Sequence, residues 1–216
     1  MRRRTAEPAP YHHGDLRRAL IAAALALVTE EQDWTFSLRE VARSAGVSPS
    51  APYNHFTEKR DLLAEVAVVG FHRLRDGLAS AVADLHAAPE AFVACVSAYV
   101  RLGMENPALY RLMFGPELTA SKGAERPPKM QVAGNEAKAI LAQIIREGAR
   151  SGDFAMSVED ERHVAIATFI AWSAVHGLTM LIIDNLTGKN VPVQPAIKLA
   201  IQTQLDGLRH GIGAIS

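Results

Sequence analysis

The 216-residue sequence contains a single cysteine, Cys95. A lone cysteine excludes an intramolecular disulfide framework and a zinc site built from several cysteines, and it suits a reducing compartment. Three arginines stand at positions 2–4, but no apolar stretch of the kind found in a signal peptide follows them. We therefore expect a cytoplasmic protein in which Cys95 is a small, buried apolar residue.

Strand patterns and an excess of charge are missing as well. Alternating apolar and polar runs are scarce, whereas apolar residues recur every three or four positions along most of the chain. The formal net charge is zero, with 23 Lys and Arg against 23 Asp and Glu, which argues against indiscriminate binding to nucleic acid. These patterns predict an all-α fold of about nine helices.

One stretch, residues 164–183, contains no charged side chain and is about long enough to cross a bilayer. It stands alone in the chain and includes His176 and Gly177, and a buried helix or a helix at a dimer interface has a similar composition. We therefore expect no membrane partner. We predict a homodimer held by the last two helices, over about 158–186 and 194–211.

The N-terminal part carries the signals of two helices joined by a tight turn. Apolar residues at three-and-four spacing predict a first helix over 14–31. Ser37 and Glu40 have the spacing of a capping box, in which a hydroxyl and a carboxylate accept hydrogen bonds from backbone amides at a helix start. The helix that begins there should end at Gly46, because glycine readily adopts the positive φ of a helix terminus.

A further short helix is predicted to start at once, since Ser48 is a favourable N-cap and Pro49 a favourable first helical residue. It should end at Phe56, and a long helix that starts near Glu58 should lead into the rest of the chain. Two short helices joined by a glycine-containing turn form a helix-turn-helix, which places its second helix in the major groove of DNA.

Small polar groups on the second short helix can approach base edges and phosphates. Basic residues before the first helix can follow the DNA backbone or enter a minor groove, and a solvated tail explains them equally well. The alternative interpretation of the whole segment is a surface hairpin whose aromatic residues belong to the core. The residues predicted to contact DNA are Arg3, Arg4, Ser37, Arg39, Ser48, Ser50, Ala51, Tyr53, Asn54, His55 and Lys59.

The run Ser-Leu-Arg-Glu-Val-Ala-Arg-Ser-Ala-Gly-Val-Ser at 37–48, followed by Tyr-Asn-His-Phe at 53–56 and by Lys59, resembles the TetR family of repressors. The match covers about residues 14–65. The resemblance implies an N-terminal three-helix DNA-binding domain, a larger helical domain that binds an effector, and a dimer formed by the last two long helices.

Carried over to matching positions, the resemblance makes 48–55 the recognition helix and makes Tyr53, His55 and Lys59 the expected phosphate contacts. Arg39 would begin the helix that positions it. One departure is the triplet Ser-Ala-Pro before the tyrosine, because proline lacks a backbone donor and favours a shorter recognition helix.

The expected layout is a flexible basic arm over 1–13, a helix-turn-helix domain over 14–60, and a regulatory and dimerisation domain over 61–216. Within the last, the segment Ala-Trp-Ser-Ala-Val-His-Gly at 171–177 looks like the C-terminal domain type that is named after its Trp, His and Gly.

Large and adaptable side chains in the C-terminal part are candidates for an effector pocket, which needs mainly apolar walls and a few polar groups. Core packing explains the same residues. Because no cluster of Lys or Arg accompanies them, we expect a neutral or weakly polar, largely apolar ligand. The residues predicted to contact the effector are Tyr99, Met104, Tyr110, Met113, Phe114, Phe169, Trp172, His176 and Met180.

An enzyme is the main competing class. His163 and His176 are too far apart to share a helical face, and no nucleophile elbow, phosphate loop, dinucleotide loop or paired carboxylate is present. His12 and His13 are adjacent but lack co-ligands at metal-binding spacing. We therefore predict no catalytic residue, metal or cofactor, and a dimeric repressor that leaves a palindromic operator when a small effector binds. A helical interaction module without DNA binding is the alternative.

Overall fold

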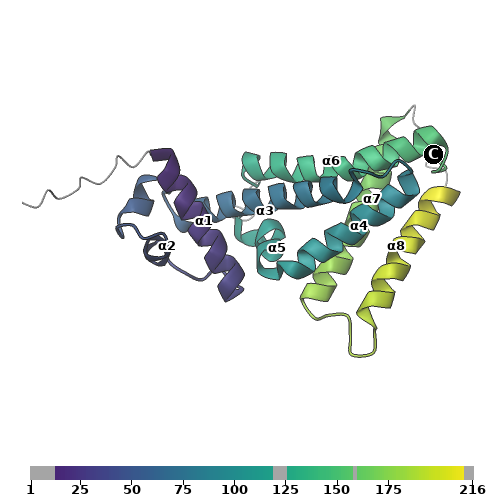
Figure 1. Ribbon diagram of the computed structural model, residues 1–216. Helices are drawn as coiled ribbons and strands as arrows, with labels where there is room; N and C mark the ends of the chain where they lie inside the picture. The colour runs from purple at the N-terminus through teal and green to yellow at the C-terminus, as the bar shows by residue number, and fades with distance from the viewer. Residues whose placement is uncertain (1–12, 119–125, 158–159, 212–216) are drawn as a thin grey trace, which may run out of the picture. The chain divides into compact units, whose positions relative to one another are not determined.

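The computed structural model describes residues 13–118, 126–157 and 160–211, and within these ranges every regular element is helical (Figure 1). Eight α-helices and two short 3-10 helices agree with the predicted all-α fold and nearly with the predicted number of helices. The elements are α1 (His13–Glu31), α2 (Leu38–Ser44), η1 (Ala51–Asn54), α3 (Lys59–Val82), α4 (Ala88–Glu105), α5 (Pro107–Phe114), η2 (Pro116–Leu118), α6 (Pro128–Ser151), α7 (Glu161–Ile183) and α8 (Val193–His210).

The chain divides into two compact units, one ending at Val66 and the other beginning at Ala67. The division falls inside α3, so this single helix contributes its first two turns to one unit and the remainder to the other.

In the first unit, the capping box at the start of α2 is confirmed. The backbone amide of Ser37 donates to Glu40 Oε2 at 2.7 Å, and the amide of Glu40 donates to Ser37 Oγ at 3.3 Å. Leu38, Val41 and Ala42 are buried, and Gly46 has a φ of +67° just after the helix end. Side chains strain this left-handed backbone, so glycine is the residue suited to the turn.

The segment after this turn differs from the prediction of a helix over 48–56. Only Ala51–Asn54 are helical, in the tighter 3-10 form. The amide of Ala51 donates to the carbonyl of Ser48, and the amide of Tyr53 donates to the carbonyl of Ser50, which are i to i−3 hydrogen bonds. Pro52 has no N–H to donate to the carbonyl of Ser48, and this missing bond interrupts an α-helix here.

The second unit is built around α4, which contacts α6, α7 and α8. Its buried side includes Phe92 and Cys95, so the cysteine is buried as expected from the sequence, and burial raises the pKa of its thiol to about 12. Phe92 meets Phe154 edge to face, with ring centroids 6.3 Å apart. Phe154 in turn covers Gly148 of α6, where a Cβ atom would lie 2.2 Å from the Phe154 ring.

Two further contacts tie the ends of this unit together. Arg111 of α5 donates from Nε to Asp184 Oδ1 at 2.7 Å, just beyond the end of α7. The amide of Ala155, in the segment after α6, donates to the carbonyl of Leu208 of α8 at 2.9 Å. The bundle therefore holds α5, α7 and α8 through polar contacts as well as apolar packing.

Among the described helices, α7 alone is long and apolar enough to pass a test for a membrane span based on length and composition. Only 33% of the tested window is buried within the chain. Phe169, Ile170 and Leu181 are the exposed large apolar side chains of this helix.

Candidate nucleic-acid interface and ligand cavity

The surface around η1 is polar and open. Ser48, Ser50 and Asn54 are exposed, and Tyr53 is 54% exposed, which is unusual for a large aromatic side chain. The hydroxyl oxygens of Ser48 and Ser50 lie 3.3 Å apart. These groups donate and accept hydrogen bonds in the way that phosphates and base edges require.

Two arginines of α2 add positive charge to the same unit. Arg39 and Arg43 are both exposed, and because they are four residues apart they share one side of the helix. Neither forms an ion pair with a described residue. The sequence-based prediction included Arg39 but missed Arg43, although the four-residue spacing was a signal that pointed to it.

Several other predicted DNA contacts also form contacts within their own unit. Ala51, the first residue of η1, is buried at 9% exposure, so it presents little surface to DNA, and its contact stays a prediction. Lys59 donates from Nζ to the carbonyl of Phe36 at 2.8 Å and so holds the start of α3 against the segment before α2. The Ser37 hydroxyl is engaged in the capping box, and His55 is half-buried beside Phe56.

Arg3 and Arg4 lie outside the described residues. Arg17 of α1, by contrast, forms contacts within the first unit. It pairs with Glu65 of α3 at 2.8 Å, and its guanidinium lies 5.4 Å from the centre of the Phe56 ring. These contacts fix the chain where it leaves η1.

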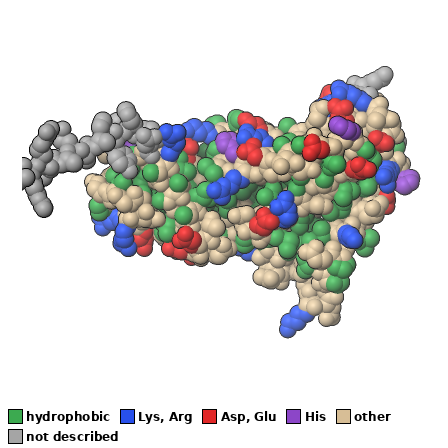
Figure 2. All heavy atoms as spheres, in the orientation of Figure 1, with side chains coloured by type: hydrophobic (Ala, Val, Ile, Leu, Met, Phe, Trp, Pro, Cys, Tyr) green, Lys and Arg blue, Asp and Glu red, His purple; other side chains and the backbone are tan. Residues whose placement is uncertain are grey.

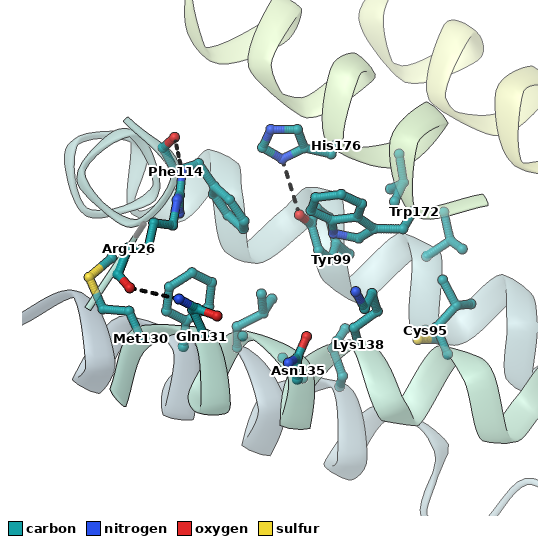
Figure 3. A pocket seen from close by; sticks show the side chains of 18 residues that line it. Cys95, Tyr99, Phe114, Arg126, Met130, Gln131, Asn135, Lys138, Trp172 and His176 are labelled. Atoms are coloured by element: carbon teal, nitrogen blue, oxygen red, sulfur yellow. Dashed lines mark hydrogen bonds between the residues drawn. The ribbon is translucent and has the colours of Figure 1, made fainter. Parts of the chain in front are cut away.

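The second unit contains a partly open cavity of about 380 Å³ between α3, α4, α6 and α7 and the end of α5 (Figure 3). This volume lies in the usual range for small-molecule sites. Its lining residues are Phe71, Leu74, Leu78, Cys95, Val96, Tyr99, Phe114, Arg126, Met130, Gln131, Gly134, Asn135, Ala137, Lys138, Leu141, Trp172, Val175 and His176.

Four of the nine predicted effector contacts, Tyr99, Phe114, Trp172 and His176, line this cavity together. The aromatic rings form a continuous wall. The imidazole of His176 stacks on Trp172 with centroids 5.3 Å apart and lies 4.4 Å from the centre of the Phe114 ring. Residues separated by more than sixty positions in the sequence therefore meet at one surface.

Five predicted contacts do not line it. Tyr110 lies behind the wall, and Met113 is buried against Gly70, where a Cβ atom would lie 2.6 Å from the methionine sulfur. Met104 lines an open groove between α4 and α8, and Phe169, 62% exposed, lines a groove beside α6. Met180 is half-buried outside the cavity. The common physical reason is that helical spacing selects a side of a helix but not the neighbour that the side meets.

A hydrogen-bonded group of three side chains closes one end of the cavity. The Tyr110 hydroxyl donates to the Tyr99 oxygen at 2.9 Å and lies 2.6 Å from His176 Nδ1. Burial raises the pKa of Tyr99 to about 12. Burial, together with the charge of Arg126, lowers the pKa of His176. The group is therefore neutral at pH 7, and Tyr99 and His176 are its two members that line the cavity.

Polar residues of α6 form another side of the cavity and were missed from the sequence. Gln131, Asn135 and Lys138 follow at i, i+4 and i+7, and all three are exposed, so they stand at the rim (Figure 3). Arg126, just before the helix, donates to the carbonyl of Met113 at 2.6 Å and also to that of Phe114. The sequence showed no cluster of Lys or Arg beside the predicted contacts, but Arg126 and Lys138 both line the cavity.

Within the described part of the chain, no three His, Cys, Asp or Glu side chains lie close enough together to hold a metal ion. The cavity is lined instead by aromatic and aliphatic side chains with a few polar groups, which is the composition of a site for an organic molecule.

Comparison with known families decides the classification. Residues 20–66 match the model of bacterial regulatory proteins of the tetR family. Residues 92–203, just over half of the chain, match the model of the tetracyclin repressor-like C-terminal domain. The chain is a TetR-family transcriptional regulator. The two matches fall on the unit that carries η1 and on the unit that contains the cavity.

Individual relatives support the assignment over nearly the whole length of the regulator. The HTH-type transcriptional regulator YobS of Bacillus subtilis (strain 168) is 23% identical over 195 residues, which are 90% of this chain and 93% of the relative. A solved structure of a protein with unknown function from Rhodococcus sp. RHA1 is 31% identical, with a TM-score of 0.76, and the match covers 94% of this chain and 100% of that one.

The fold is also shared with the transcriptional regulator FadR of Bacillus subtilis, whose structure was solved in complex with stearoyl-CoA. It is 19% identical, with a TM-score of 0.63, over 90% of this chain and 98% of FadR. At this identity the likeness concerns the fold.

Proposed function

We propose that the regulator is a cytoplasmic, homodimeric repressor that binds a palindromic operator and is released when a small molecule enters the cavity of its second unit. The observation that carries the proposal is the presence, in one chain, of an exposed polar surface around η1 and a partly open cavity with an aromatic wall. We propose no catalytic role for the cavity. Its polar groups are those of the hydrogen-bonded Tyr99, Tyr110 and His176 and of the residues at the rim.

Contact with DNA is assigned to the exposed polar groups of the first unit. Tyr53, Ser48 and Ser50 project from or beside η1, and Arg39 and Arg43 supply unpaired positive charge on α2. Phosphate contacts by such groups position a protein on the duplex, and contacts to base edges select the sequence. Lys59 and His55 also contact their own unit, and they remain proposed phosphate contacts, as Arg3 and Arg4 remain candidates for a DNA-binding arm.

A gel-shift titration with the regulator's own upstream region tests this assignment. The measurement is made at one fixed salt concentration, because neutralisation of phosphates makes affinity fall steeply with salt. A specific complex is expected with that DNA and not with a shuffled duplex of equal length. Equal affinity for both duplexes would contradict operator recognition and favour an interaction module.

Dimerisation is assigned to α7 and α8. Phe169 and Leu181 on α7 and Leu199 on α8 are 62%, 47% and 69% exposed in the single chain, which is costly for large apolar groups in water. Gly177, on the same i, i+4 row as Phe169, has no neighbour within 4 Å of the position of a Cβ atom. No described neighbour requires a glycine there, whereas close approach of a second copy would favour one.

Sedimentation equilibrium at micromolar concentration tests the dimer. We expect twice the monomer mass for the wild type and a shift toward monomer for Leu199→Glu, which places a charge on the exposed side of α8. Lys189→Glu, in the loop before α8, is the matched control and should leave the mass unchanged. A monomeric wild type at this concentration would contradict the proposed interface.

The cavity and the DNA-binding unit share α3. Lys59 to Val66 of this helix belong to the first unit, and Phe71, Leu74 and Leu78 line the cavity. A ligand that fills the cavity changes DNA binding only to the extent that it prefers the conformer that fits DNA poorly. By reciprocity, operator DNA must weaken ligand binding by the same factor, typically about five- to 150-fold for such couplings.

A further inference from the structure

We infer that the cavity binds an amphipathic carboxylate, with its apolar part between α3 and α4 and its anionic group at the rim formed by Gln131, Asn135 and Lys138. The inference rests on the proposed function, because it names the chemical class of the molecule that occupies the regulatory cavity. It replaces the neutral ligand that was expected from the sequence.

The described residues that line the cavity carry a net positive charge. Among the described residues that line the cavity, two are cationic, Arg126 and Lys138, and none is Asp or Glu. The protein as a whole has equal numbers of acidic and basic residues. A cavity lined by cations without acids therefore departs from the composition of the chain, and it attracts anions and repels cations.

No acidic side chain in the described part of the chain pairs with either cation of the cavity. Lys138 makes no ion pair with any described residue, and its Nζ lies 5.7 Å from the centre of the Trp172 ring. The acidic residues nearby are engaged elsewhere. Glu136 pairs with Arg75 at 2.7 Å, and Glu161, beside Lys138 in the neighbouring groove, pairs with Arg146 at 2.9 Å. A carboxylate at the rim would supply the missing partner.

Arg126 is the second cation of the cavity that has no described acidic partner. Its guanidinium donates to the carbonyls of Met113 and Phe114 at the end of α5, but no described carboxylate pairs with it. Burial lowers its pKa, which reflects the unfavourable solvation of the charge at this position. An anion in the cavity offsets that penalty through the electrostatic field, even where the ligand does not touch the guanidinium.

The distribution of polar groups selects an amphipathic molecule over an inorganic anion. Leu74 and Leu78 of α3, Val96 of α4 and Leu141 of α6 provide aliphatic wall, and the Trp172 ring stacks on His176 in the aromatic part of the lining. The exposed amides of Gln131 and Asn135 and the ammonium of Lys138 stand on one side of α6. A compact inorganic anion would leave most of the apolar wall without a partner.

The test compares three probes with the same twelve-carbon chain and different head groups. Dodecanoate, 1-dodecanol and dodecyltrimethylammonium are titrated into the full-length wild type by calorimetry, below the concentration at which micelles form. We expect dodecanoate to bind at least tenfold more tightly than 1-dodecanol, and the cation to bind more weakly than both. Equal affinities for the anion and the alcohol would overturn the inference, as would no measurable binding of either.

Matched variants locate the anionic group. Lys138→Gln should weaken dodecanoate binding about tenfold and leave 1-dodecanol unchanged, because a side chain at the rim loses its charge but keeps most of its length. Lys189→Gln, an exposed lysine in the loop before α8 that does not line the cavity, is the control and should change neither. An unchanged affinity for dodecanoate in Lys138→Gln would overturn the assignment of the rim.

Gel-shift titration with dodecanoate separates this inference from the proposed function. Operator release at the dodecanoate concentration that saturates the cavity supports both the carboxylate site and the proposed regulatory function. Tight, Lys138-dependent binding of dodecanoate without release of operator DNA supports the carboxylate site and contradicts the regulatory role of the cavity.

Discussion

The unit that ends at Val66 and the unit that begins at Ala67 are specified by interactions of different range. In the first, the decisive contacts are local, since Ser37 and Glu40 are three residues apart and the short form of η1 follows from Pro52. In the second, a single cavity collects side chains from Phe71 to His176, over a hundred residues of sequence. The comparison shows that an exposed recognition surface is set mainly by capping and turn residues, whereas an enclosed site exists only after distant helices have packed.

The second unit has apolar side chains on its outer surface as well as in its cavity (Figure 2). On the face drawn, hydrophobic side chains are exposed in the region of α4 and α8. Met104 and Leu199, which line the open groove between α4 and α8, are among the exposed large apolar side chains. Most of the aromatic wall around His176, by contrast, faces inward. One apolar surface of this unit therefore suits a second protein chain, and the other suits a small molecule.

Loss of the aromatic wall should give the largest effect. We expect Trp172→Ala to weaken binding of a cavity ligand by more than a hundredfold, about 2.7 kcal/mol, because stacking on His176 and a large part of the wall are lost together. Operator affinity without ligand should be unchanged, since the residue belongs to the second unit. Calorimetry with dodecanoate and gel shift without it measure the two quantities.

A melting curve must accompany this variant, because removal of a packed tryptophan side chain costs up to about 3–5 kcal/mol of stability. Trp172→Phe keeps an aromatic wall and serves as the graded control. A folded Trp172→Ala protein that binds the ligand and leaves DNA at the wild-type ligand concentration would show that the cavity is not the regulatory site.

Crowding of the second unit's core should give the next largest effect. In Gly148→Ala the new methyl group would lie 2.2 Å from the Phe154 ring, so we expect the free energy of unfolding in urea to fall by about 1–3 kcal/mol. Gly134→Ala on the same helix is the control. Its methyl group would meet Phe71 at an ordinary 3.4 Å, and alanine favours the helix by up to about 1 kcal/mol. Equal destabilisation by both changes would refute this account of α6 packing.

In the first unit, Tyr53→Ala should reduce operator affinity at least tenfold, about 1.4 kcal/mol, because an exposed phenol that positions the protein on phosphate is lost. The dimer and the melting temperature should not change, since the side chain is exposed. Gel shift at fixed salt measures the affinity, and Tyr53→Phe separates the hydroxyl from the ring. Unchanged affinity in Tyr53→Ala would remove the residue from the interface.

The smallest effect is expected from the helix cap. Ser37→Ala should lower the free energy of unfolding by about 1 kcal/mol, because the amide of Glu40 loses its acceptor at the start of α2. The Ser37 amide and hydroxyl also lower the pKa of Glu40, so the variant should raise that pKa toward its ordinary value, as followed by NMR titration. Ser37→Asp restores an acceptor and should recover most of the stability. Unchanged stability in Ser37→Ala would show that this local cap does not stabilise the first unit.

Signals between residues that are close in the chain were sufficient to predict the helical class, the capped start of α2 and the turn at Gly46. They also placed the limits of α1, α7 and α8 to within a few residues. A hydroxyl three positions before a carboxylate and a glycine at a positive φ act over such short range that no distant contact is needed. The TetR-like motif lies in the same local segment, so the order of its amino acids is enough to reveal the resemblance to the family.

The packing of distant helices determines which residues share the cavity and what charge the cavity carries. Spacing along a helix predicted that Trp172 and His176 lie on one side, but it assigned equal weight to Phe169 and Met104, which face other grooves. Nor does any local pattern show that Lys138 lies beside Trp172 or that Glu136 pairs with Arg75. These contacts join residues tens of positions apart, and they depend on how helices cross when their apolar sides are removed from water.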